Sequence, residues 1–192
     1  MYQGTAGYAS ILEWGIPMAD IRQRVADDQG ILKKIQTFVP GFRGYRLRED
    51  LRDSDRMLRA QLAKKLESIQ KDLENCRDVL AKRNKYSELD NIGGLISKMK
   101  EIRGKVSHAE TGYSGLVADI EIKEEELNRL YEFDANMLEG IVLLARQAEA
   151  LKDAVGFDQT EVGKDLISMD SGLNEFKEQF SRRMRVIEGT EV

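Results

Sequence analysis

Four residue types are scarce in this 192-residue chain, which contains two prolines, one cysteine, one histidine and one tryptophan. Because the prolines are Pro17 and Pro40, no proline interrupts a helix after residue 40. The single cysteine, Cys76, excludes an intrachain disulfide and fits a reducing cytoplasm. The single histidine, His108, has no glutamate three residues before it, which argues against the Glu-x-x-His pairs of di-iron bundles.

Other absences exclude further classes of protein. The net charge is −4 with both signs interspersed, so the basic excess of a nucleic-acid-binding protein is missing and nucleic acid is not an expected partner. No run of about 18 uninterrupted apolar residues predicts a spanning helix. The N-terminus lacks a basic stretch followed by an apolar one, so we expect no secretory signal and a cytoplasmic location.

Catalytic motifs are missing as well. The chain contains no G-x-S-x-G, no phosphate-binding loop and no CxxC, and Cys76 takes a position typical of a small buried apolar residue. We therefore expect neither enzymatic activity nor a cofactor.

Regular apolar seams are the main positive feature. Apolar residues make up 41% of the chain and charged residues 33%, and the apolar ones recur at alternating spacings of three and four. Such spacing keeps one stripe of each helix against its neighbours. The sequence predicts an all-α fold, an elongated antiparallel four- to five-helix bundle with coiled-coil-like packing. We expect an irregular segment over 1–16 and a single bundle over 17–192, with helices at about 17–38, 46–82, 91–109, 123–155 and 159–187.

Two helix ends carry specific expectations. Residues 84–90 read as a connection, with Asp90 or Asn91 as the N-cap of the third helix. Near the C-terminus, Arg182, Arg183 and Arg185 lie in the final turns of the last helix, where positive charge complements the helix dipole.

Three aspartates, Asp28, Asp55 and Asp134, interrupt the apolar seams. Burying a carboxylate alone is costly, so each needs a partner. In one interpretation they pair with arginine or tyrosine and set the register of the helices. In the other they form a carboxylate-only site for Mg²⁺ or Mn²⁺, since hard cations prefer oxygen ligands.

A G-aromatic-x-G pattern occurs twice. Residues 40–45 read Pro-Gly-Phe-Arg-Gly-Tyr and residues 111–116 read Thr-Gly-Tyr-Ser-Gly-Leu, and each precedes a long helix, which suggests an internal repeat. Glycine permits positive φ, so we expect compact turns whose aromatic residue inserts into the end of the bundle. Alternatively, the two corners form a loop pair that binds a protein partner or an anion. Its binding residues would be Gly41, Phe42, Arg43, Gly44, Tyr45, Arg46, Arg48 and Arg52 in the first corner, and Gly112, Tyr113, Ser114 and Gly115 in the second.

The two corners carry opposite charge. Arginines crowd the first, whereas Asp119, Glu121 and Glu124 follow the second. The corners would therefore attract each other, within one bundle or between protomers.

The segments Pro-Gly-Phe-Arg-Gly-Tyr and Gly-Tyr-Ser-Gly-Leu, with Leu-Asn-Arg-Leu-Tyr-Glu-Phe-Asp at 127–134, carry a resemblance to a known group. They resemble a family of uncharacterised prokaryotic helical-bundle proteins with paired G-aromatic-x-G corners, over residues 38–140. The resemblance implies a helical bundle. It brings no established activity, so no catalytic role is carried over.

These features favour a non-catalytic interaction or scaffold protein that self-associates, with a protein or a second copy of the chain as partner. One alternative is peripheral membrane association through residues 1–16, which hold Trp14 and two tyrosines but no lysine or arginine. A second alternative is a metal-dependent hydrolase that uses the seam aspartates.

Overall fold

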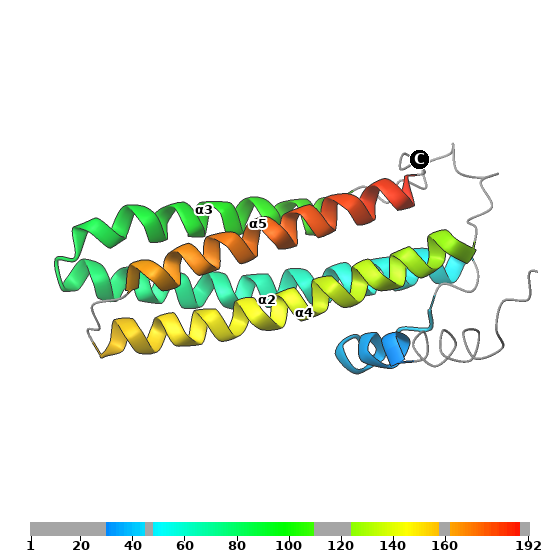
Figure 1. Ribbon diagram of the computed structural model, residues 1–192, viewed down its shortest axis with the longest axis horizontal. Helices are drawn as coiled ribbons and strands as arrows, with labels where there is room; N and C mark the ends of the chain where they lie inside the picture. The colour runs from blue at the N-terminus through cyan, green and yellow to red at the C-terminus, as the bar shows by residue number, and fades with distance from the viewer. Residues whose placement is uncertain (1–29, 45–47, 110–123, 158–161, 189–192) are drawn as a thin grey trace, which may run out of the picture.

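The computed structural model describes residues 30–44, 48–109, 124–157 and 162–188. Within these ranges the chain forms a helical segment at 30–38 and four long helices, and no strand. The helices are α2 (Arg48–Lys82), α3 (Tyr86–His108), α4 (Glu124–Gly156) and α5 (Val162–Ile187). Successive helices run in opposite directions and lie along one long axis (Figure 1). The predicted all-α bundle is therefore confirmed.

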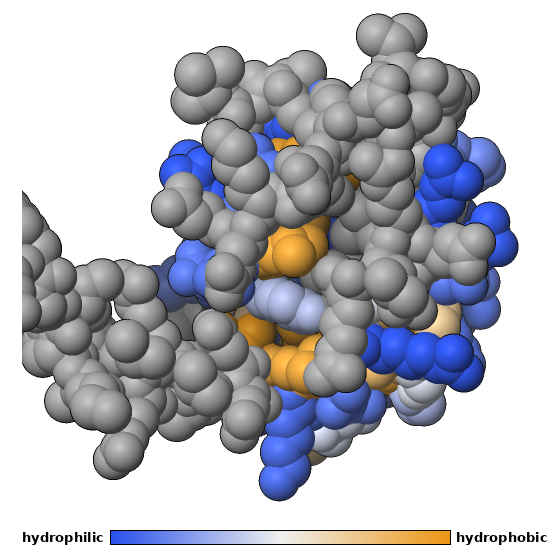
Figure 2. Space-filling view, turned by 90° about the vertical axis from the view of Figure 1, so that its right-hand side faces the viewer, coloured by the Kyte–Doolittle hydropathy of each residue, from blue (hydrophilic) through white to orange (hydrophobic). Residues whose placement is uncertain are grey.

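The four helices form a square in cross-section. Helix α2 packs against α3 and α4, and α5 packs against α4 and α3, so α2 and α5 lie on one diagonal of the square. We call the end where α2 and α4 begin and α3 and α5 end the corner end, and the opposite end the far end. Seen from the corner end, hydrophobic side chains show near the centre of the view and hydrophilic ones around its rim (Figure 2).

The seam positions that the sequence predicts form the core. Their regular spacing puts successive seam residues on one face of each helix, and removing a leucine side chain from water stabilises the fold by roughly 1.5–3 kcal/mol. Helix α5 shows the pattern over its whole length, with buried side chains at Val162, Leu166, Met169, Leu173, Phe176, Phe180, Arg183 and Ile187.

The helical segment 30–38 packs against both α2 and α4. Ile35 is fully buried against the core. On one side Lys34 pairs with Glu139 of α4, and on the other the Lys65 ammonium of α2 lies 5.8 Å from the centre of the Phe38 ring. Residues 17–29, which the sequence predicts to extend this helix, lie outside the described part of the chain.

The predicted start of the third helix was wrong. Helix α3 begins at Tyr86, and Asp90 and Asn91 are exposed residues within it, not its N-cap. The break falls at Asn84, which has a φ of 56°. The amide of Asn84 donates to Ala81 O and that of Lys85 to Leu80 O, a left-handed C-terminal motif in which asparagine takes the usual place of glycine.

No breaker stands between Lys85 and Asp90, so the helix starts at once after the turn. Glu88 lies in its first turn, where a carboxylate complements the helix dipole, and Leu89 packs against the core. Helix α4 begins at Glu124 and ends at Gly156, against 123–155 from the sequence, and α5 ends at Ile187. Among the described residues no helix is both long and apolar enough to cross a membrane.

Candidate functional site

Two of the three seam aspartates are brought together by one arginine. Arg183 of α5 donates from Nε to Oδ1 of Asp134 on α4, at 2.5 Å, and from Nη1 to Oδ1 of Asp55 on α2, also at 2.5 Å. The side chains of Arg183 and Asp134 are completely buried and that of Asp55 is 2% exposed. The guanidinium thus joins α5 to α2 across the diagonal of the bundle, where the helices themselves do not pack closely.

A second arginine extends this network to the remaining helix. Arg59, one turn after Asp55 on α2, donates from Nε to the other oxygen of Asp55, Oδ2, at 2.8 Å. Its Nη1 donates to the carbonyl oxygen of Ala109 at 2.7 Å and to that of Val106 at 3.4 Å. These carbonyls belong to the end of α3, where backbone acceptors lack helical partners. All four long helices are therefore linked at the corner end.

The network consists of two carboxylates and two guanidiniums, so its formal charges cancel. We call Asp55, Arg59, Asp134 and Arg183 the charge network. Removing one partner from such a buried group leaves an uncompensated charge and costs about 3–5 kcal/mol. A shift of one helix along its axis would separate these donors from their acceptors, so the network favours the observed register.

These contacts favour the first interpretation for two of the three seam aspartates. Asp55 and Asp134 pair with arginine, as the first interpretation predicted. Arg183 lies between the two carboxylates, in the position that a bridging cation would need. Within the described ranges no group of three or more His, Cys, Asp or Glu side chains could hold a metal ion. Asp28 lies outside those ranges.

The role expected for Arg183 needs correction. The sequence suggested that it complements the dipole of α5, together with Arg182 and Arg185. Instead, Arg183 takes a core position of the seam, while its neighbours Arg182 and Arg185 carry exposed ion pairs to Glu178. The sequence could not predict this role, because the buried acidic partners of Arg183 lie on other helices.

The first glycine corner, residues 40–44, forms a compact turn as predicted. Gly41 and Gly44 both have a φ of 89°. Phe42 is 2% exposed and packs into the core. A Cβ at Gly44 would lie 2.7 Å from the hydroxyl oxygen of Tyr131, so glycine is required for space as well as for conformation. The Ser54 hydroxyl donates to Gly44 O at 3.2 Å, which places the corner beside Asp55.

These contacts do not test whether the predicted binding residues bind a partner. Arg43 and Arg52 are exposed, and Arg43 lines a small hollow of about 340 Å³ with Asp53 of α2. The backbone of Arg48 begins α2, but its side chain is not among those described. Outside the described residues lie Tyr45 and Arg46, and the whole second corner, Gly112, Tyr113, Ser114 and Gly115. The predicted attraction between the corners stays a prediction.

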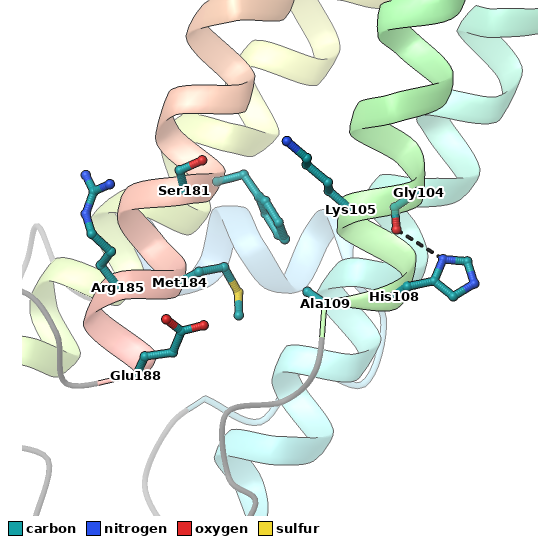
Figure 3. Close-up of a pocket in the computed structure, with 9 residues that line it drawn as sticks. Gly104, Lys105, His108, Ala109, Ser181, Met184, Arg185 and Glu188 are labelled. Carbon is teal, nitrogen blue, oxygen red and sulfur yellow. Dashed lines mark hydrogen bonds between the residues drawn. The ribbon is translucent and has the colours of Figure 1, made fainter.

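A cleft of about 650 Å³ lies between the last turns of α3 and α5. Lys105 reaches from α3 toward α5 and Met184 points into the space between the helices, whereas His108 is turned away (Figure 3). Nδ1 of His108 lies 3.1 Å from Gly104 O in the preceding turn. Lys105 pairs with Glu101. The residues that line this cleft therefore do not form a nucleophile–base arrangement.

Polar cross-links join α3 to α5 above this cleft. Glu101 of α3 accepts hydrogen bonds from Lys105 at 2.8 Å and from Lys177 of α5 at 2.9 Å. These two ammonium groups lower the pKa of Glu101 from 4.5 to about 2. One helical turn away, Lys98 bonds to Asp170 and Asn174 of α5.

The single thiol is unsuited to nucleophilic chemistry. Cys76 is buried in the seam of α2, as the sequence predicted. Burial raises the pKa of its thiol, and the nearby Asp72 carboxylate raises it further. Because the thiolate is the reactive form, both effects suppress reactivity.

The outer face of α4 carries the feature that the sequence did not reveal. Val142 and Leu143 are adjacent and exposed, at 37% and 52%. A hollow of about 350 Å³ lies on one side, between α4 and Phe38, and another of about 330 Å³ on the other side, toward Gly172 of α5. Leu143 and Glu139 line both hollows and so form a ridge between them. We call the exposed face of α4 formed by Glu139, Val142, Leu143 and Arg146 the α4 ridge.

Comparison of the chain with family models, curated proteins and solved structures finds no match. The resemblance stated from the sequence therefore stays a prediction, and the function has to be argued from the residues themselves.

Proposed function

We propose that this protein is a non-catalytic interaction protein, a helical-bundle scaffold that self-associates. The observation that carries the proposal is the pair of adjacent exposed side chains Val142 and Leu143, whereas the other exposed large apolar side chains among the described residues, Tyr86, Phe157 and Ile167, stand singly. Scattered exposed apolar residues are ordinary, but a contiguous apolar surface between polar rims is typical of an interaction site. Here the flanking residues are the charged Glu139 and Arg146.

The rigidity of the bundle supports the same proposal. A charge network holds all four helices in one register at the corner end, and apolar seams hold the far end. A surface on such a scaffold changes little when a partner docks, so binding requires little ordering. We further propose a reducing compartment, the cytoplasm, since the only cysteine is a buried free thiol.

The proposal is tested by measuring the mass of the full chain against its concentration. Sedimentation velocity and light scattering over roughly 1 µM to 1 mM, where weak complexes dissociate, should show a reversible increase in mean mass. A strict monomer over the whole range would contradict self-association.

A further inference from the structure

The α4 ridge is self-complementary, and this complementarity rests on sequence positions as well as on surface shape. Glu139 lies three residues before Val142, and Arg146 lies three residues after Leu143. Residues three and seven apart share one face of a helix, so the two charges are arranged symmetrically about the Val142–Leu143 pair.

We propose that the α4 ridge is the contact between two copies of this chain, which pack α4 against α4 in antiparallel fashion about a two-fold axis. The axis passes between Val142 and Leu143. Each Glu139 then faces Arg146 of the second copy, so the interface has two identical ion pairs around an apolar centre. This proposal rests on the proposed function, because it names the partner and the surface of the self-association.

The charges on the ridge are available for this pairing. Arg146 makes no ion pair with any residue in the described ranges. Glu139 pairs with Lys34, but both side chains are more than 60% exposed, at 62% and 63%. An exposed pair of this kind contributes little and leaves the carboxylate able to accept a second cation.

The shape of the ridge suits a symmetric contact. Leu143 stands between two hollows, and helices pack when the ridge of one enters the groove of the other. A two-fold interface requires that one patch contain both ridge and groove. The helical segment 30–38 lines the hollow on one side of the ridge through Lys34 and Phe38, and it leaves Glu139, Val142, Leu143 and Arg146 exposed.

The same symmetry limits the contact. It brings Glu132 opposite Asp153 of the second copy, and two facing carboxylates repel. Because Ala135 is only 7% exposed, the favourable overlap runs from Glu139 to Arg146, about 10 Å at 1.5 Å per residue. An interface of this length is small, so the dimer should be reversible and depend on concentration.

The closing experiment uses two charge variants of the full chain, alone and mixed. In Glu139→Arg both ridge charges are positive, and in Arg146→Glu both are negative, so each variant should self-associate at least about tenfold more weakly than the wild type. Mixed together, they should form a heterodimer, because every ridge charge then faces its opposite. Sedimentation velocity with one variant labelled measures all three states.

A second pair of variants tests the apolar centre. Leu143→Glu should also weaken association by at least about tenfold, since it puts two carboxylates near the axis. Ile167→Glu, at an exposed apolar residue of α5 outside the ridge, is the matched control and should associate like the wild type. Thermal unfolding of each variant verifies that the monomer fold is intact.

The outcomes separate the two proposals. If the wild type is monomeric throughout, self-association itself is wrong. If the wild type associates but Leu143→Glu and the charge variants associate equally well, or if the mixed charge variants do not pair, then the protein self-associates through another surface and the α4 ridge is excluded.

Discussion

At the far end of the bundle the seam positions hold apolar side chains, such as Leu73, Leu95 and Leu151, whereas at the corner end two aspartates and two arginines take equivalent places. The apolar end gains stability from close packing of its side chains. This gain would be similar if the same leucines were paired differently across the core. The charged end gains little net stability from its ions, because their desolvation is costly. Its hydrogen bonds, however, form in only one alignment of the helices. The comparison suggests that the far end supplies most of the stability and the corner end supplies the register.

The two ends also differ in how their backbone groups are satisfied. At the far end Arg83, from the turn after α2, donates to the carbonyl oxygens of Val155 and Gly156 at the end of α4. At the corner end the buried Arg59 does the same for α3. In both cases a guanidinium binds the C-terminal carbonyls of a helix, where positive charge is favourable. Of these two arginines, Arg59 is the one that belongs to the buried charge network.

The largest expected effect comes from Arg183→Ala. It leaves two buried carboxylates without their shared partner, so the free energy of unfolding should fall by about 3–5 kcal/mol. Urea denaturation followed by circular dichroism measures the change. Arg182→Ala, which removes an exposed arginine 49% accessible to solvent, is the matched control and should change stability by less than about 0.5 kcal/mol.

A double variant separates lost charge pairing from lost packing. Asp134→Leu with Arg183→Met removes one charge of each sign and keeps the Asp55–Arg59 pair. It should lose less stability than Arg183→Ala alone, because no buried charge is left unpaired. A double variant that is less stable than the single one would show that this end depends on its ions for stability and not only for register.

At the far end Leu73→Ala should cost about 2–5 kcal/mol, since Leu73 is fully buried and a cavity remains. Leu73→Met keeps the volume and should cost less than about 1.5 kcal/mol. The same denaturation measurements apply. Equal losses for the two variants would mean that this end does not depend on close packing.

A substitution in the first glycine corner should cause a smaller loss of stability. Gly44→Ala places a Cβ at positive φ and 2.7 Å from the hydroxyl oxygen of Tyr131, so it should cost about 1–3 kcal/mol. Gly93→Ala in α3 is the control, because nothing lies within 4 Å of the added Cβ. It should stabilise the helix by up to about 1 kcal/mol. If Gly44→Ala is neutral, the corner is not fixed by this glycine.

The smallest expected effect is on the stability of the fold at acidic pH. The pKa of Glu101 in the folded protein is lowered to about 2, so its contribution is present above its ordinary value of 4.5 and is lost as the pH falls toward 2. The wild type should therefore be slightly more stable than Glu101→Gln at pH 7, and this difference should shrink steadily between pH 4.5 and 2. A difference that is independent of pH would mean that the Lys105 and Lys177 contacts do not persist in solution.

Part of the fold and part of the charge network could be predicted from local patterns in the sequence. The spacing of apolar residues located the seams of α2, α4 and α5, and it marked Asp55 and Asp134 as interruptions that need partners. The start of α3 was misplaced because Asn84 serves as the left-handed turn residue without glycine or proline to signal it. Arg183 was assigned to the helix dipole alone, because its partners lie 49 and 128 residues away in the sequence.

The sequence by itself determined that the chain is helical, where its helices bury an apolar stripe, and that two aspartates lie on those stripes. It could do so because helix periodicity and residue polarity are local properties. Only the tertiary structure decided that one arginine joins both aspartates across the bundle, and that Val142 and Leu143 face outward beside two hollows. Those facts depend on which helices become neighbours, and this is set by the packing of the whole bundle and not by any single segment.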